Sequence, residues 1–463
     1  MTAAEFIKIL ERTDPANQRF LTQAQTGRRY YHNDGDIRKT GAAAIDEVNR
    51  FLKTLGRNPL HSADNRVPTN WHQIITDQKI GYLFTYPPQF DAGEAETNKK
   101  ISETLGQDYA KVLRQLATDA TNCGVGWLAY WYNPGEPFSY WFVDPEQVRV
   151  VFDPASVKPR ILYLIRAWSE TDADRRTVLH YEAWNEKEVS YFVSAEGGAP
   201  VLDMQRGRGG IARHTYGRIP FIPFRNNADA RGDLPRYKEL IDCIDKLVSG
   251  FANDLDDIQE IIWVIKNYAG ETSETVTAED GSEVTREIDL LQRLKAQKLV
   301  HVDQDGGVDT LRGEIPFEAR SRFLEILKSQ LYISAMAVDP FPDAVGQASG
   351  IYIDFLYGLL EMKSGLMETE FRSALDELAQ AILLHLGISS RPIEQVWTRN
   401  KPKNDLETVQ MISQTSETVL SDESKTKAHP LTEDWQEERK RIEAENAQKL
   451  KSAAAAFGGG DGE

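Results

Sequence analysis

Asp, Glu, His and Cys are the residues with which this 463-residue sequence could do chemistry. Asp303 and Asp305 have the spacing of two calcium ligands, but the Glu that would close a calcium loop does not follow. Carboxylates are plentiful enough for a two-metal nuclease, yet no clustered pair with a nearby Lys stands out. We therefore predict no metal site.

The motifs of common enzyme classes are also missing. There is no Gly-Lys dipeptide for a phosphate-binding loop, no H-E-x-x-H and no C-x-x-C. The run "GQASG" at Gly346 to Gly350 lacks the central serine of a nucleophile elbow. Cys123 and Cys243 lie far apart within apolar patterns, so we expect two buried thiols. We predict no catalytic residue and no cofactor.

Composition limits the classes of partner. At 41% hydrophobic and 463 residues, the chain can bury a core, and we expect two to four subdomains. The first residues carry no signal-peptide pattern, and no apolar run approaches bilayer length, so we expect a soluble cytosolic protein without a membrane partner. A formal charge of −17 argues against strong binding of nucleic acid, which needs Lys and Arg.

The first half of the chain predicts helices followed by a sheet. Apolar spacing predicts helices at Ala42 to Leu55 and Asp108 to Ala120. From Val125 to Phe224, short β-rich runs between turn residues predict an antiparallel meander. The alternation in "TVLHYEAW" places His180 and Glu182 on a solvent-facing side.

A long helix is predicted next, from Leu234 to Asn267, with Asp233 as its N-cap and Pro235 in its first turn. One face of this helix is apolar. The other is predicted to be solvated, and it carries Asp242, Asp245, Ser249, Asn253, Asp256 and Glu260.

A small polar module follows from Tyr268 to Gly313, with a short helix at Ile288 to Lys295. Asp305, Gly306 and Gly307 predict the turn of a hairpin within it. A second helix then returns from Pro316 to Ala337. Two long helices that flank a small module predict a stalk with a head.

The stretch "DPFPDAVGQASG" at Asp339 to Gly350 interrupts the helical pattern with two prolines and two glycines. The pattern resumes at once in a third helix, Ile351 to Leu386, where Gly358 and Gly365 permit a bend. A strand and turn follow at "PIEQVWTRNKPKN", then short helices from Asp405 and a charged helix at Glu433 to Lys451. The final "SAAAAFGGGDGE" is predicted to be disordered.

The order of these parts resembles the portal proteins of tailed double-stranded-DNA bacteriophages. The resemblance covers roughly Tyr30 to Glu445 and rests on local stretches as well as on order. These stretches are "NRVPTNWHQIITDQKIGYLFTYPP", "GRIPFIPFRNN" with "YKELIDCIDKLVSGFANDLDD", and "SETVLSDESKTKAHPLTEDWQEERKRIEAE".

The resemblance implies an α+β protomer with a helical and β wing, a two-helix stem, a small α/β clip, a long spine helix and a helical crown. The implied boundaries are wing 1–233, stem 234–267 and 314–338, clip 268–313, tunnel loop 339–350, spine helix 351–386, wing strand and crown 387–451, and tail 452–463.

The resemblance also implies roles for residues. The tunnel loop would face a central channel with Asp343, Ala344, Val345, Gly346, Gln347, Ala348 and Ser349. The stem would face DNA with Asp256, Glu260 and Lys328. The clip would dock other proteins with Glu271, Glu274, Glu283, Arg286, Asp303 and Asp305.

The resemblance implies that the chain forms a ring at one capsid vertex. The protein would lie in the virion and, during assembly, in the host cytoplasm, and its partners would be those of such a ring. They are further copies of the chain, commonly twelve, double-stranded DNA held weakly, the terminase large subunit, a head-completion or adaptor protein, and the major capsid and scaffolding proteins. Two alternatives stay open: an intracellular scaffold or adaptor with a helical stalk, and a metal-dependent nuclease.

Overall fold

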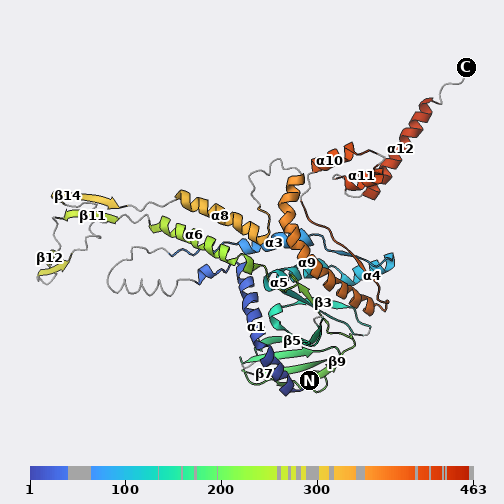
Figure 1. Cartoon of the computed structure of the whole chain (residues 1–463), viewed down its shortest axis with the longest axis horizontal. Helices are drawn as coiled ribbons and strands as arrows, with labels where there is room; N and C mark the ends of the chain where they lie inside the picture. Colours follow the sequence, from blue (N-terminus) through green and yellow to red (C-terminus); the bar gives the residue numbers. More distant parts are fainter. Residues whose placement is uncertain are drawn as a thin grey trace. The chain divides into compact units, whose positions relative to one another are not determined.

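The computed structural model describes residues 1–39, 64–133, 135–157, 160–171, 175–195, 197–257, 262–268, 273–277, 283–287, 302–311, 317–339, 350–401, 405–416, 419–429, 432 and 435–457 (Figure 1). The chain divides into two units: the first is Met1–His32, Trp71–Tyr237 and Tyr332–Glu463, and the second is Asn33–Asn70 and Lys238–Leu331. Both contain helices and strands, which confirms the predicted α+β class. The helices expected at Ala42 to Leu55 and Ile288 to Lys295 lie outside the described residues.

The first unit begins with helices. These are α1 (Ala3–Tyr31), α3 (Trp71–Phe84), α4 (Ala95–Leu105) and α5 (Tyr109–Cys123). Thr2 and Glu5 form a capping box that satisfies two backbone amides at the start of α1. The apolar face of α5 is buried at Leu113, Leu116 and Ala117, and the prediction of a helix there is confirmed.

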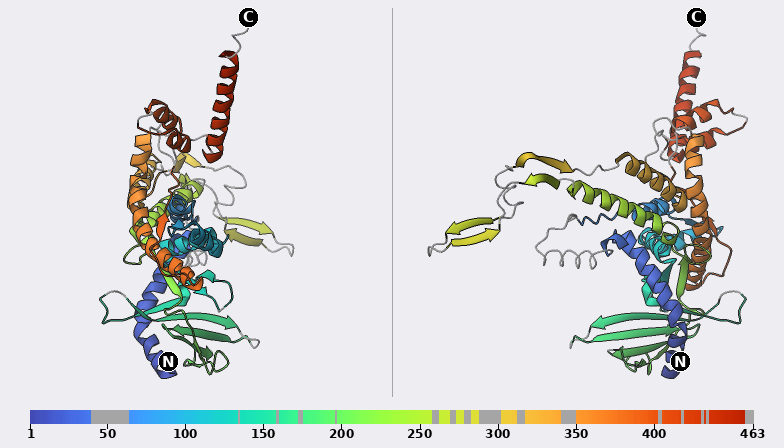
Figure 2. Two further views of the ribbon diagram at one scale, coloured as in Figure 1. Left: turned by 90° about the vertical axis from the view of Figure 1, so that its right-hand side faces the viewer. Right: turned by 60° about the vertical axis from the view of Figure 1, so that its left-hand side comes forward.

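Two antiparallel sheets follow the helices. Strands β2 (Val125–Trp131), β3 (Ser139–Val143) and β10 (Phe221–Arg225) form one sheet in the order β10-β2-β3. The other sheet contains β4 (Val148–Phe152), β5 (Ile161–Thr171), β6 (Thr177–Trp184), β7 (Glu188–Ala195) and β8 (Val201–Leu202) in sequence order, with β9 (Ile211–Arg213) paired to β7. The second sheet confirms the predicted meander from β4 to β8. The prediction of one meander from Val125 to Phe224 was wrong for β2, β3 and β10, because β10 pairs with β2 in a separate sheet. Helix α1 lies along this sheet (Figures 1 and 2), where Phe6 stacks on Phe192 at a ring-centroid distance of 4.0 Å.

The face of β6 predicted to be wet is partly covered. Glu182 is buried and accepts hydrogen bonds from Arg206 (3.2 Å) and from Trp184 Nε1 (3.3 Å). The guanidinium of Arg206 also lies over the ring of Trp168, on which His180 stacks. The expectation of a solvated Glu182 was therefore wrong, because arginine stems and aromatic rings cover this part of the sheet.

The later helices match the sequence pattern closely. Helix α8 (Phe317–Ala335) is followed by α9 (Gly350–His385), and β15 (Glu394–Val396) pairs with β1 (Gln89–Asp91). Three further helices are α10 (Asp405–Gln414), α11 (Asp422–Ala428) and α12 (Trp435–Phe457). Disorder from Ser452 onward was a wrong prediction as far as Phe457, because a run of alanine, the best helix former, prolongs α12. No helix among the described residues is long and apolar enough to cross a bilayer.

The second unit corrects two predictions. Helix α6 (Lys238–Asp257) ends ten residues before Asn267, and β11 (Ile262–Tyr268) follows it. The run "IIWVIKNY" is rich in β-branched and aromatic residues, which favour a strand over a helix. The hairpin at Asp305 to Gly307 was also wrong, because β14 (Val302–Leu311) is one strand paired with β11. The register shifts between Lys266 and Tyr268, so the two glycines accompany a bulge instead of a turn.

The polar face of α6 is covered by residues 64–70 instead of by solvent. Asn253 Oδ1 accepts the backbone amide of Asn65 (2.6 Å), and Asp245 Oδ1 accepts that of Thr69 (2.8 Å). Between them, Ser249 Oγ accepts the amide of Val67 (3.0 Å). The three acceptors are four residues apart on the helix, a rise of about 6 Å, and the three amides are two residues apart on an extended chain, a rise of about 6.6 Å. The two sets of groups therefore lie at matching intervals. Burial raises the pKa of Asp245. The prediction of a solvated face was wrong at Asp245 and Ser249, which are buried, whereas Asp256 is exposed.

Candidate functional site

The predicted tunnel loop lies almost wholly outside the described residues, which resume at Gly350 after Asp339. Its seven named residues, Asp343 to Ser349, therefore have no described position. The two chain segments that lead into and out of this loop are described. We call the residues that hold these two segments in the first unit the loop anchor, formed by Lys79, Asp233, Lys363, Asn226 and Gln78.

The exit from α8 is fixed by backbone contacts. Met336 has a left-handed φ of 51°, and the Ala337 amide donates to the Tyr332 carbonyl at 3.0 Å, which ends the helix. Two residues later, Gln78 of α3 binds Val338 twice: its Nε2 donates to the carbonyl (2.7 Å) and its Oε1 accepts from the amide (2.9 Å). The backbone that enters the loop is therefore held by a side chain of α3.

The same exit is held from α9. Lys363 Nζ donates to the carbonyl of Ala335, the last residue of α8, at 2.9 Å. A positive charge at the carboxyl end of a helix is also favoured by the helix dipole. Tyr82, Val338 and Leu360 form a small apolar cluster beside this contact. The segment that enters the loop is therefore joined both to α3 and to α9, the helix that follows the loop.

A buried ionic cluster lies at the centre of the anchor. Asp233 Oδ2 is 2.8 Å from Lys363 Nζ and 3.2 Å from Lys79 Nζ, and all three side chains are at most 2% exposed. Asn226 accepts from Lys79 (2.5 Å) and donates to Asp233 Oδ1 (2.8 Å). Asp233 carries the only carboxylate within 4 Å of either ammonium in the described part of the chain. Two buried cations thus share one counter-ion.

The electrostatics of this cluster follow from burial and charge. Burial opposes ionisation of Asp233, but the two lysines and Asn226 outweigh it and hold its pKa below the ordinary value. Burial lowers the pKa of Lys79 to about 8 despite the attraction of Asp233. His72, bonded to Tyr237 (2.8 Å) and Asn122 (2.9 Å), has its pKa lowered to about 4, mainly by burial.

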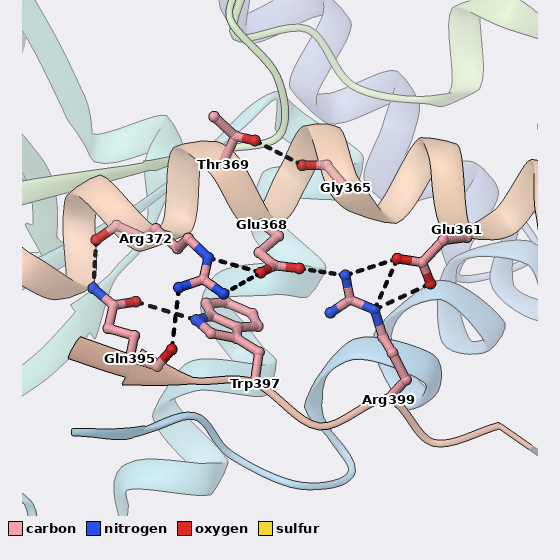
Figure 3. Close-up of polar contacts among 8 residues, drawn as sticks. All are labelled: Glu361, Gly365, Glu368, Thr369, Arg372, Gln395, Trp397 and Arg399. Carbon is pink, nitrogen blue, oxygen red and sulfur yellow. Dashed lines mark hydrogen bonds and ion pairs between the residues drawn. The ribbon is translucent and has the colours of Figure 1, made fainter. Parts of the chain in front are cut away.

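A second set of contacts fixes the other side of α9 (Figure 3). Arg399 donates to Glu361 at 3.0 Å and also to Glu368. Arg372 donates to Glu368 (2.7 Å) and lies over the ring of Trp397 at 5.4 Å. These contacts join the segment that contains β15 to α9. The spine helix is therefore held on two sides within its own unit.

The predicted stem residues are only partly placed. Asp256 is exposed and accepts a hydrogen bond from Asn65 Nδ2 at 2.6 Å, and Lys328 is exposed on α8. Glu260 lies outside the described residues. The face that includes Asp245 and Ser249 is used for packing, so it offers less polar surface to a ligand than the sequence predicted.

The predicted clip residues lie mostly on strands. Strands β12 (Ser273–Thr277) and β13 (Glu283–Glu287) pair in a register that sets Glu274 opposite Arg286. Asp303 and Asp305 lie on β14, and Glu283 lies opposite Thr277. Glu271 lies outside the described residues.

Asp233, Lys79 and Lys363 had no assigned role in the sequence analysis. Asp233 was predicted to cap a helix, but it makes no capping hydrogen bond and its carboxylate turns to the lysines. Lys79 could have been found, because it lies four residues after Ile75 and four before Leu83, on the apolar side of a helix. No group of three or more His, Cys, Asp or Glu in the described residues could hold a metal ion. Of the two cysteines, Cys123 is buried as expected, whereas Cys243 is only half-buried.

Comparison with known proteins identifies the class. The profile described as "Phage portal protein, SPP1 Gp6-like" matches residues 10–452. A portal protein of Clostridium phage phiCD119 is 32% identical over 454 residues, 94% of both chains. The portal protein of Bacillus phage SPP1 is 29% identical over 440 residues, 90% of this chain and 82% of that one.

Solved structures that resemble the chain include the neck of a native gene transfer agent particle computed with C12 symmetry, at 12% identity and a TM-score of 0.42. The neck of an empty gene transfer agent particle computed with C6 symmetry is 13% identical, with a TM-score of 0.44. Each match covers 82% of this chain and 92% of the other. The sequence comparisons define a phage portal protein, as the sequence predicted. The chain belongs to the SPP1 Gp6-like family of phage portal proteins.

Proposed function

We propose that copies of this chain close into a ring, commonly of twelve, at one vertex of a capsid. Double-stranded DNA passes through the central channel during packaging and ejection. Membership of the portal family across residues 10–452 is the observation that carries this proposal. The role is structural, and the ring itself performs no chemistry.

The tunnel loop, residues 339–350, is proposed to form a collar around the DNA. Its tip carries one carboxylate, Asp343, and no Lys or Arg, so it can contact DNA by shape without holding phosphates. The formal charge of −17 on each subunit adds repulsion that limits friction. DNA that slides past a collar pulls on it. The loop anchor supports the proposal because it ties the segment that enters the loop to α3 and to α9.

The stem and clip are proposed to extend the conduit and to dock other proteins. Asp256, Glu260 and Lys328 face the DNA in this proposal, with Lys328 as a transient phosphate contact. The clip, residues 268–313, is acidic and offers Glu271, Glu274, Glu283, Arg286, Asp303 and Asp305 to the terminase large subunit and to head-completion proteins. The major capsid and scaffolding proteins surround the wing.

Negative-stain electron microscopy of the purified protein, with its mass in solution, tests the ring. We expect rings with a central hole and a mass of roughly twelve times 52.3 kDa. A monomer or dimer at every salt concentration would contradict the proposal and favour an adaptor with a stalk. Magnesium-stimulated cleavage of DNA by the pure protein would instead favour the nuclease.

The collar is tested by DNA packaging into preformed heads. Asp343→Lys places a ring of positive charge at the collar, and we expect packaging to slow, most strongly at low salt. Asp153→Lys is the control, because it makes the same charge change on a loop that follows β4 in the wing. Equal packaging rates for both variants would contradict a collar at this loop.

A further inference from the structure

Helix α9 has a second apolar face that the described residues leave uncovered. Four large side chains on it are exposed although they repeat every three or four residues: Phe355 (79%), Leu359 (40%), Met362 (64%) and Leu366 (52%). The opposite face is buried at Leu360, Met367 and Phe371. A helix that is apolar on two faces needs two partners, and the described residues of the first unit supply only one of them.

Two glycines open the same face. Gly358 and Gly365 lie two turns apart and alternate with the exposed side chains, and a Cβ atom added at either would meet nothing within 4 Å. Glycine weakens a helix interior relative to alanine, so its presence here needs a reason. No neighbouring atom in the described residues requires it, but close approach of another helix would. We call these six residues, Phe355, Gly358, Leu359, Met362, Gly365 and Leu366, the α9 apolar face.

A complementary face exists on the same chain. Helix α8 exposes Phe317, Phe323, Ile326 and Ile333, and three of these repeat along one side of the helix at spacings of three and seven residues. Among the described helices and strands, only α8 and α9 carry more than one exposed large hydrophobic side chain. Two different patches on one chain make a head-to-tail contact, and such contacts generate a ring when the rotation closes.

We propose that the α9 apolar face packs against the exposed face of α8 on the next copy of this chain, the glycines admitting its bulky side chains. The inference deepens the proposed ring and rests on it, because it names the surfaces by which subunits meet. A patch of this size is smaller than a standard interface of roughly 800 Å² per partner, so it acts together with further contacts around the ring.

A matched pair of variants tests the face. Met362→Arg places a charge on the α9 apolar face, and Met204→Arg makes the same change at a methionine of similar exposure, 68% against 64%, on a turn after β8. We expect Met362→Arg to raise the protein concentration needed for half-assembly at least tenfold in sedimentation experiments. Met204→Arg should leave it unchanged, and both monomers should keep the circular dichroism of the parent.

Gly365→Leu separates folding from assembly. Leucine favours a helix more than glycine does, so the isolated subunit should unfold at the same or a higher temperature. The same side chain fills the depression, so ring formation should weaken. Normal assembly of both Gly365→Leu and Met362→Arg would overturn the inference while leaving the ring itself intact, and would assign the face to a partner other than a second copy.

Cross-linking identifies the facing surface. One chain carries Leu359→Cys and another Ile326→Cys, and a short bis-maleimide is added to each alone and to their mixture. Covalent dimers that form in the mixture well above either chain alone support contact of α9 with α8 of the next copy. Rings that assemble without such a product would overturn the proposed pairing, whereas a parent protein that forms no ring would overturn the proposed function as well.

Discussion

Replacement of Asp233 by asparagine is the sharpest test of the loop anchor. The carboxylate is the shared counter-ion of Lys79 and Lys363, and its Oδ2 lies 3.2 Å from the Lys79 ammonium and 2.8 Å from that of Lys363. The other oxygen accepts from Asn226 Nδ2 at 2.8 Å. An amide keeps one oxygen and no charge, so Asp233→Asn leaves two buried cations without a counter-ion. If its oxygen faces the lysines, its NH2 group also faces the NH2 group of Asn226, and two hydrogen-bond donors meet.

The expected magnitude follows from this geometry. Removal of one partner of a buried ion pair costs about 3–5 kcal/mol, because the remaining charge stays desolvated. For a unit of about 330 residues, the unfolding entropy is large, so this loss corresponds to a fall of roughly 4–7 °C in Tm. Asp14→Asn is the control, since Asp14 is 53% exposed and its pair with Arg149 contributes at most about 1 kcal/mol.

The assay is thermal unfolding at a fixed protein concentration near pH 7, where ring formation is checked separately. The double variant Asp233→Asn with Lys79→Met removes one of the two cations that lack a counter-ion, and it should recover part of the lost thermal stability. A Tm for Asp233→Asn within about 1 °C of the Asp14→Asn value would refute the reasoning, because the lysines would then not depend on this carboxylate.

Three further outcomes are expected. The pKa of Lys79 in the folded state, about 8, lies below its ordinary value of 10.5, so Lys79 loses its proton at a lower pH in the folded state than in the unfolded state. As the pH rises from 8 to 10.5, the parent should therefore gain up to about 3 kcal/mol of stability relative to Lys79→Met, as measured by denaturant titration. His72 is neutral in the folded state, with a pKa of about 4, so the parent should lose stability relative to His72→Gln as the pH falls from 6.5 to 4. Gly27→Ala should lower Tm although alanine favours helices, because the new Cβ would lie 2.2 Å from the Asn122 carbonyl oxygen. Gly81→Ala is the control and should not lower Tm, because a Cβ at that position would meet no atom within 4 Å.

The sequence predicted the elements whose pattern is local. The helix over Asp108 to Ala120 and the spine helix follow from apolar spacing, and the structure confirms them. The β-rich runs between turn residues predicted a meander, which the structure confirms for β4 to β8. The stem helix was predicted too long because apolar spacing continued through Ile265. A strand rich in isoleucine can satisfy a helical spacing over a few residues, and pairing with β14 decided the outcome.

The loop anchor could not be predicted in the same way, since its members come from distant parts of the chain. Lys79 and Lys363 are separated by 284 positions, and lysine is rarely buried, so a surface role was the natural expectation for each. The prediction for the polar face of α6 was wrong for a related reason. Nothing local to the helix shows that Asn65, Val67 and Thr69 will place their amides along it.

Helix α9 joins the two proposals. One side of it carries Lys363, which holds the end of α8, and the adjacent residue Met362 lies on the α9 apolar face. A neighbouring subunit that packs on this face therefore presses on the same turn of helix that anchors the loop. Because packed interiors have low compressibility and transmit strain, and shift between discrete arrangements, ring closure should fix the loop ends in one position. A buried ionic cluster suits this purpose better than an apolar one, since it loses its bonds when the helix slides by a turn.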